Sequence, residues 1–254
     1  SVQHIFLSSL MSWFQSQLQV LKKLLLQRMG LRLCKQTNCM GRKVHPVIFR
    51  IGITRGWDGV WFAGKKRFSR LLQEDVKLRA FVKKQSRDAL LDRVEIERSR
   101  QDVKINLYAA KPGVIIGRAG AGIEDLTKKI KKNFYRGRRV KVSINVKEVQ
   151  KPSLSAAVVA QQIAVDIEKR MHFRRVMKWA LERVKKADAK GVKITVGGRL
   201  NGAEIARSET VSYGKIPLHN LRSDIDYSSI MARTIWGAIG IKVWINRGEV
   251  FEQK

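Results

Sequence analysis

Apolar and polar residues alternate along the middle of the chain in patterns that predict an ordered set of helices and strands. From about Arg70 to Leu90 the apolar residues recur at helical spacing. The runs "RVEIERS" and "DVKINLYAA" alternate at period two across a short polar turn, which predicts a β-hairpin. A glycine-rich loop comes next, and "RVKVSINVKEV" reads as a further strand. Between the two, an amphipathic helix is marked by Ile123, Leu126, Ile130 and Phe134.

Beyond Pro152 the pattern changes to two helices followed by strands. An Ala/Val/Ile-rich helix is expected from Leu154 to about Arg170, and a basic helix from about Phe173 to Ala187. Four strand-like runs follow: "VKITVGGRL", "AEIARSETVS", the region around "DIDYSS", and "IGIKVWI". Because no helix separates these strands, the expected fold class is α+β, with two helices on an antiparallel sheet in the second half.

The first 39 residues differ from the rest of the chain. They contain no acidic residue and are rich in Leu, Gln and Ser. They resemble an organelle transit peptide, or an extension translated upstream of a start at Met40. We therefore expect residues 1–39 to be a leader or upstream extension outside the fold. Residues 40–150 form an N-terminal region around the hairpin and glycine loop, and residues 151–254 a C-terminal α+β domain.

The charge balance points to a polyanionic partner. Fifty-two Lys+Arg against 21 Asp+Glu give a net charge of +31, and nucleic acid is the usual partner of so basic a globular chain. An anionic membrane surface is the second candidate. No stretch reads as a spanning helix, because the most apolar one, Ile5 to Leu26, is interrupted by glutamines and a lysine pair, and no membrane partner is expected. The two cysteines, Cys34 and Cys39, exclude a disulfide framework and lack a second ligand pair for zinc. No metal or cofactor is expected.

The stretch "VIIGRAGAGIE" places three glycines in six residues, a composition that lets a backbone approach phosphates. As a Walker loop, Gly117 and Gly122 have the required spacing, but Ile123 and Glu124 stand where the lysine and the hydroxyl are needed. As a dinucleotide loop, the glycines are in the wrong order. A turn without function is the structural alternative.

The order of elements around this loop favours a nucleic-acid backbone. Helix, hairpin, loop, helix and strand follow in the order of a type II K-homology (KH) domain, whose Gly-x-x-Gly turn clamps a few nucleotides. The turn here is Gly117, Arg118, Ala119 and Gly120. The glycines permit close approach, the next helix offers N-terminal N–H groups, and Arg118 adds charge. Gly122 is expected to belong to the turn into that helix. Residues 114–116 are expected to pack in the core, or alternatively to form a floor for bases.

Several longer motifs carry a specific resemblance. The stretches "MGRKVHPVIFRIGI", "PGVIIGRAG", "FRRVMKWAL", "GRLNGAEIARSE", "IPLHNLRSDIDY" and "IGIKVWINRGEV" follow one another from Met40 to about Phe251. Together they resemble the bacterial small-subunit ribosomal protein S-three family. This resemblance implies a type II KH domain followed by an α+β domain. It also implies a place in the head of the small subunit, binding to small-subunit rRNA, and contact with mRNA at the entrance to its channel.

The resemblance also implies roles for particular residues. The basic cluster that helps to unwind incoming mRNA falls on Arg174, Arg175 and Lys178. At i, i+1 and i+4 of a helix, the first and third share a face, although a solvated face is the commoner meaning of such a cluster. The family's rRNA-contacting start falls on "GRKVHP", with Arg42, Lys43 and His45 as candidates.

The chain departs from the family pattern in two places. Thr210, Val211 and Ser212 replace expected aromatic and charged residues, and "SSIMARTIWGAIG" at 228–240 replaces a stretch that usually carries "EAHTTYG". Contacts with neighbouring proteins or rRNA at these segments are therefore left open. By resemblance, the protein neighbours are the head proteins numbered ten and fourteen. The location implied is the cytoplasmic ribosome, or an organelle if the leader is a transit peptide.

Three classes of function remain to be compared: a ribosomal component, a free-standing KH-type RNA-binding regulator, and an enzyme acting on RNA. Asp224 and Asp226 are either paired carboxylates or one polar face of a strand. The histidines show neither metal-ligand spacing nor a nucleophile partner: His4, His45, His172 and His219. We therefore expect the first class, with unwinding of mRNA by electrostatic capture of strands and without ATP.

Overall fold

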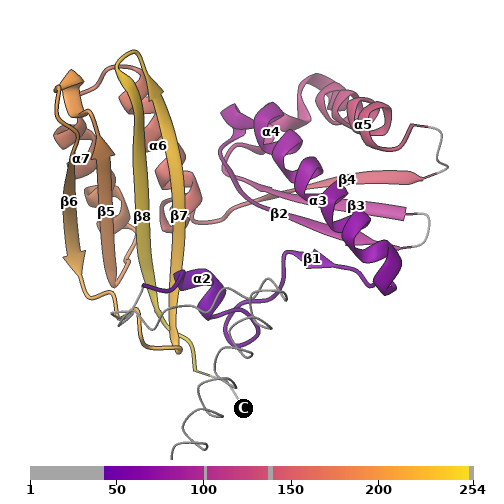
Figure 1. The fold of residues 1–254 in the computed structure, drawn as a ribbon, viewed down its shortest axis with the longest axis horizontal. Coiled ribbons are helices and arrows are strands. Elements are labelled where there is room, and N and C mark those ends of the chain that lie inside the picture. The colour runs from indigo at the N-terminus through magenta and orange to yellow at the C-terminus, as the bar shows by residue number, and fades with distance from the viewer. Residues whose placement is uncertain (1–42, 100–101, 137–139, 252–254) are drawn as a thin grey trace, which may run out of the picture. The chain divides into compact units, whose positions relative to one another are not determined.

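The computed structural model describes residues 43–99, 102–136 and 140–251. From Val44 on, the described residues group as one compact unit, and the leader expected at 1–39 lies outside the described residues. No helix of the described part is long and apolar enough to cross a membrane. Figure 1 shows the fold as a KH-type unit and a second sheet with its own helices.

The N-terminal part contains the expected elements in the expected order. Its helices and strands are α2 (Pro46–Phe49), β1 (Gly59–Val60), α3 (Lys65–Gln85), β2 (Leu91–Arg98), β3 (Asp102–Ala109), α4 (Pro112–Ile116), α5 (Ala121–Phe134) and β4 (Lys141–Glu148). Within the described residues the strands form one four-stranded sheet in the order β1-β2-β3-β4. The β2–β3 hairpin is antiparallel and β4 adds in parallel to β3.

The predicted helix of about 70–90 differs from α3 at both ends. α3 begins five residues earlier, directly after Gly64, because Lys65 to Ser69 continue the helix without an apolar stripe that would reveal it. It ends at Gln85, and a short 3-10 turn then leads to Leu90, whose φ of 53° reverses the chain into β2. The short strand β1 and the helix α4 were not predicted, since two and five residues show no periodicity.

The C-terminal part has two helices on an antiparallel sheet, as the pattern predicts. The elements are α6 (Ala156–Glu168), α7 (Phe173–Lys186), β5 (Gly191–Gly198), β6 (Arg207–Gly214), β7 (Ser223–Thr234) and β8 (Gly237–Glu249), with sheet order β6-β5-β8-β7 in the described residues. Both helices lie on one face of this sheet (Figure 1). The expected strand from 203 begins only at Arg207, because residues 200–202 form a 3-10 turn.

Each part has its own hydrophobic core. In the first, α3 and α5 place Leu78, Val82 and Ile130 against the buried side of β2 and β3. The face of β4 predicted from Val140, Val142, Ile144 and Val146 packs against the same core. In the second, α6 and α7 cover Ile194, Ile241 and Val243 on β5 and β8. These cores fix the ends of α5 and α7, where the candidate site residues lie.

Residues shortly after Val44 contact the C-terminal domain. Arg50 is fully buried, and its guanidinium donates to backbone carbonyls. The accepting oxygens are those of Pro46, Pro217, Leu218, Asn220 and Ser223. Burial lowers the pKa of Arg50, and nearby Asp224 opposes this shift. Arg50 thus holds the loop before β7 through hydrogen bonds that no hydrophobic pattern indicates.

Candidate nucleic-acid interface

The glycine loop forms a tight, exposed turn between α4 and α5. Gly117 has φ of 69° and Gly120 of 83°, values that L side chains rarely adopt. Ala119 between them also has a positive φ, of 50°, which is a strained conformation for alanine. Arg118 is exposed and has no hydrogen-bond or ion-pair partner among the described residues. The loop therefore presents backbone and one uncompensated cation to solvent.

Gly122 has a packing role that the sequence did not indicate. It lies inside the first turn of α5 rather than in the turn before it. A Cβ atom there would stand 2.4 Å from the carbonyl oxygen of Ile115 and 3.0 Å from that of Ile116. Only glycine lets α5 approach the end of α4 so closely, and this approach sets the shape of the loop.

The residues around the loop divide between core and surface. Ile115 is buried, whereas Val114 and Ile116 are 56% and 38% exposed beside the glycines. The first turn of α5 carries Glu124, which together with Asp125 faces Lys128 at 3.8 and 4.0 Å. These carboxylates already complement the helix dipole, so the attraction for a phosphate rests mainly on Arg118 and the loop N–H groups.

The basic helix α7 exposes the predicted cluster on one side. One side of the helix is buried against the sheet and consists of Phe173, Val176 and Met177. The three cations are exposed on the other side: Arg174, Arg175 and Lys178. The same helix thus separates apolar and cationic faces, as its spacing predicts.

The cations of α7 have different environments. Arg174 donates from Nε and Nη2 to the Glu209 carboxylate of β6, at 3.2 and 3.1 Å. The hydrogen bonding from Arg174 lowers the pKa of the Glu209 carboxyl group. The guanidinium of Arg175 lies 4.6 Å from the ring centre of Trp179, one turn further along.

Sequence reasoning missed three residues of this surface. Arg207 lies 3.6 Å from Glu209, and its guanidinium and that of Arg174 both lie within 6 Å of the Phe173 ring centre. Trp179 was detectable as an aromatic at i+4 from Arg175. Glu209 and Arg207 were not, because only the docking of β6 beside α7 brings them to the cluster.

Among the predicted rRNA-contacting residues near the start of the chain, His45 has a structural role. Arg42 lies outside the described residues, and Lys43 is exposed. His45 caps α2, since its Nδ1 accepts a hydrogen bond from the Ile48 N–H at 3.4 Å. Its ring meets that of Tyr227 edge-on at 4.8 Å, and partial burial lowers its pKa. Its imidazole is therefore engaged within the fold.

The paired aspartates are part of an ion-pair network. Asp226 is buried and accepts from Arg55 at 3.0 Å, from Arg247 at 3.2 Å and from the Ala156 N–H at 2.8 Å. Asp224 lies 3.6 Å from Arg247. These contacts fix β7 to the start of α6. In the described part of the chain no group of three or more His, Cys, Asp or Glu residues could hold a metal ion.

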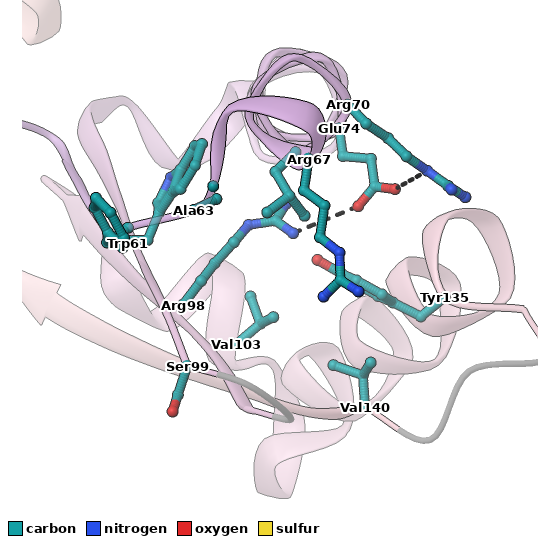
Figure 2. A pocket seen from close by; sticks show the side chains of 13 residues that line it. Trp61, Ala63, Arg67, Arg70, Glu74, Arg98, Ser99, Val103, Tyr135 and Val140 are labelled. Atoms are coloured by element: carbon teal, nitrogen blue, oxygen red, sulfur yellow. Dashed lines mark hydrogen bonds and ion pairs between the residues drawn. The ribbon is translucent and has the colours of Figure 1, made fainter.

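A cavity of about 950 Å³ lies between the start of α3, the end of β2 and the end of α5 (Figure 2). Glu74 points into it and pairs with Arg70 at 3.6 Å and Arg98 at 3.4 Å. Arg98 also pairs with the buried Asp75, which accepts from the Trp61 indole at 2.7 Å. Because Arg70 and Arg98 on this wall are matched by carboxylates, we interpret the cavity as a structural junction.

The KH-type unit with its exposed glycine loop has the fold of an RNA-binding module. The KH domain family matches residues 77–154, and the family described as Ribosomal protein S3, C-terminal domain, matches residues 163–245. The chain is also similar along most of its length to small ribosomal subunit protein uS3 of several bacteria.

The uS3 protein of Oenococcus oeni is 47% identical over 213 residues, which cover 83% of this chain and 80% of the relative. That of Desulforudis audaxviator is 49% identical over 215 residues, or 85% and 97% of the two chains. That of Leuconostoc citreum is 47% identical over 219 residues, or 85% and 98%. The chain belongs to the uS3 family and is a component of the small ribosomal subunit.

Proposed function

We propose that this protein binds small-subunit rRNA in the head of the subunit and contacts incoming mRNA at the entrance to its channel. In this role it separates paired strands of mRNA without ATP. Base pairs open by thermal motion, and the energy of ATP is not used. The separated strands are then held through their phosphates by Arg174, Arg175 and Lys178, which prevents them from pairing again. The chemistry required is a set of fixed cations beside a single-stranded path, and no nucleotide site takes part.

The observation that carries the proposal is the exposed cationic side of α7. Its residues are held in place, because the helix is anchored by buried Phe173, Met177 and Val184. Arg174 is oriented by Glu209 and Arg175 by Trp179. Fixed guanidinium groups lose little side-chain entropy when they bind phosphate, so they suit a surface that must hold a strand briefly and release it.

We propose a second RNA contact at the glycine loop. Gly117 and Gly120 let the backbone reach a phosphodiester, Arg118 supplies the charge, and exposed Val114 and Ile116 offer an apolar surface for an adjacent base. We assign this contact to rRNA, together with Arg42 and Lys43 near the start of the chain. The neighbouring head proteins, those numbered ten and fourteen by resemblance, are proposed as further partners.

Sedimentation of the full chain with small subunits tests the rRNA assignment. A protein anchored in the head remains on the subunits through a high-salt gradient, because several phosphate contacts act together with protein contacts. A free-standing KH-type regulator would instead dissociate into the unbound pool. Hydroxyl-radical footprints of the subunits with and without the protein then locate the contact, and protection outside the head would contradict the proposal.

A further inference from the structure

Three turns of the C-terminal domain meet beside the start of α7 and enclose a small pocket of about 220 Å³. They are the turn between α6 and α7, the 3-10 turn after β5 (Leu200–Gly202), and the turn that joins β7 to β8. The pocket lining includes Arg170, His172, Arg199, Asn201, Trp236 and Phe173. None of its lining residues is acidic. Its volume is below the range of about 300–1,000 Å³ that suits drug-sized ligands, so it suits one ring system.

The turn between β7 and β8 has unusual residues at its tip. Thr234 and Gly237 pair across it, which leaves Ile235 and Trp236 as the connecting residues. Such two-residue connections normally use Asn, Asp or Gly. Here two large apolar side chains are 70% and 47% exposed. Local turn chemistry does not account for these two side chains, so a role in binding is the alternative.

The side chain of Trp236 is held in place from one side. Its ring lies on Gly202, where a Cβ atom would stand 3.1 Å from the indole carbons. Arg199 donates to the carbonyl oxygens of Ala203 at 2.9 Å and Trp236 at 3.2 Å, which ties the turn after β5 to the hairpin tip. The indole is therefore fixed by the fold while almost half of its surface stays accessible.

The pocket is continuous with the cationic cluster of α7. Phe173 lines the pocket and also contacts the guanidinium groups of Arg174 and Arg207. The His172 ring stacks on Phe173 with centroids 5.0 Å apart and planes 19° from parallel. The exposed His172 ring, supported by buried Phe173, thus adjoins cations that face solvent, which is the combination that binds single-stranded nucleic acid.

We propose that this pocket holds one unpaired base of a single-stranded RNA whose backbone lies along Arg174 and Arg207. Trp236 supplies a stacking surface, and Arg170, Arg199 and Asn201 supply polar groups toward the base edges. The proposal rests on the function proposed above for α7 and adds that the separated strand is held by a base as well as by phosphates. Because stacking tolerates every base, little sequence preference is expected.

The test uses the full chain and a short single-stranded RNA, with affinity measured at several salt concentrations. Trp236→Ala is expected to weaken binding roughly 5- to 150-fold, the range for loss of one stacked base. The slope of affinity against salt should not change, since no phosphate contact is lost. Trp236→Phe should restore most of the affinity. Trp57→Ala is the matched control, because Trp57 is 70% exposed and lies far along the chain.

An oligonucleotide of equal length without bases separates stacking from charge. Wild type and Trp236→Ala should bind it equally. RNA carrying 4-thiouridine should crosslink to residues 170–173, 199–202 or 234–237. Affinity of Trp236→Ala within twofold of Trp57→Ala, or crosslinks confined to other segments, would overturn the pocket. That result would not contradict the proposed role of the α7 cations. Their role is tested separately, because removal of the arginines is expected to change the slope of affinity against salt.

Discussion

The carboxylate of Glu209 on β6 holds the guanidinium of Arg174 on α7 through two hydrogen bonds. Arg174 remains 63% exposed in this pair, so the acid orients the cation without covering it. Glu209 also lies near Arg207 and therefore sets the net charge of the whole cluster. A substitution at Glu209 alone therefore changes the net charge of this cationic surface.

Glu209→Gln should strengthen the binding of single-stranded RNA. Because the pair is exposed to solvent, it contributes little to stability, so the fold should persist while the cluster gains one net positive charge. Without the competing carboxylate, Arg174 and Arg207 attract phosphates more strongly, which steepens the dependence of log affinity on log salt by about 0.7. Glu204→Gln is the control, because Glu204 is exposed and makes the same charge change elsewhere. Equal slopes for the two variants would show that Arg174 is not restrained by Glu209.

Arg118→Asp combined with Ala119→Asp should weaken RNA binding at the glycine loop. Two carboxylates facing a phosphodiester cost several kcal/mol, which corresponds to a loss of at least about 100-fold at matched salt. Aspartate tolerates the positive φ of residue 119, so the turn itself should form. The neutral pair Arg118→Gln with Ala119→Asn is the control for shape. Unchanged affinity of the acidic variant would exclude the loop as a clamp.

Gly122→Ala should destabilise the KH-type unit by about 1–3 kcal/mol, because the added methyl group meets backbone oxygens that cannot move aside. Gly113→Ala is the matched control. It lies in α4 with open space around it, and alanine is the better helix former there. Urea unfolding of both variants gives the comparison. A Gly122→Ala protein as stable as the control would mean that α4 and α5 separate without cost.

The elements with clear periodicity were predictable, and short or non-local features were not. The hairpin of β2 and β3, the amphipathic α5, and the α6–α7 pair followed from spacing alone. The predicted KH order and the α+β second half are confirmed. Gly122 was assigned to the wrong element, because its role depends on an approach by α4 that no pattern records.

Some residues of the candidate site could be predicted from local sequence, whereas others are brought together only by the fold. Residues that share a helix or a loop, such as Arg174 and Lys178, could be grouped from the sequence. Glu209, Arg207 and Trp236 join them only after β6 and the β7–β8 turn fold beside α7. The segments that depart from the family pattern, 210–212 and 228–240, lie in β6 and in the β7–β8 hairpin.

We propose that the cations of α7 help to open paired mRNA. The most direct measurement is the rate of translation by ribosomes that carry Arg174→Ala with Arg175→Ala, on messages with and without a stable hairpin. Lys186→Ala with Lys190→Ala, which removes the same charge beyond the cluster, is the control. We predict normal subunit assembly, an unchanged rate on the unstructured message and a slower rate on the hairpin message for the arginine variant alone. Equal rates on both messages would contradict it.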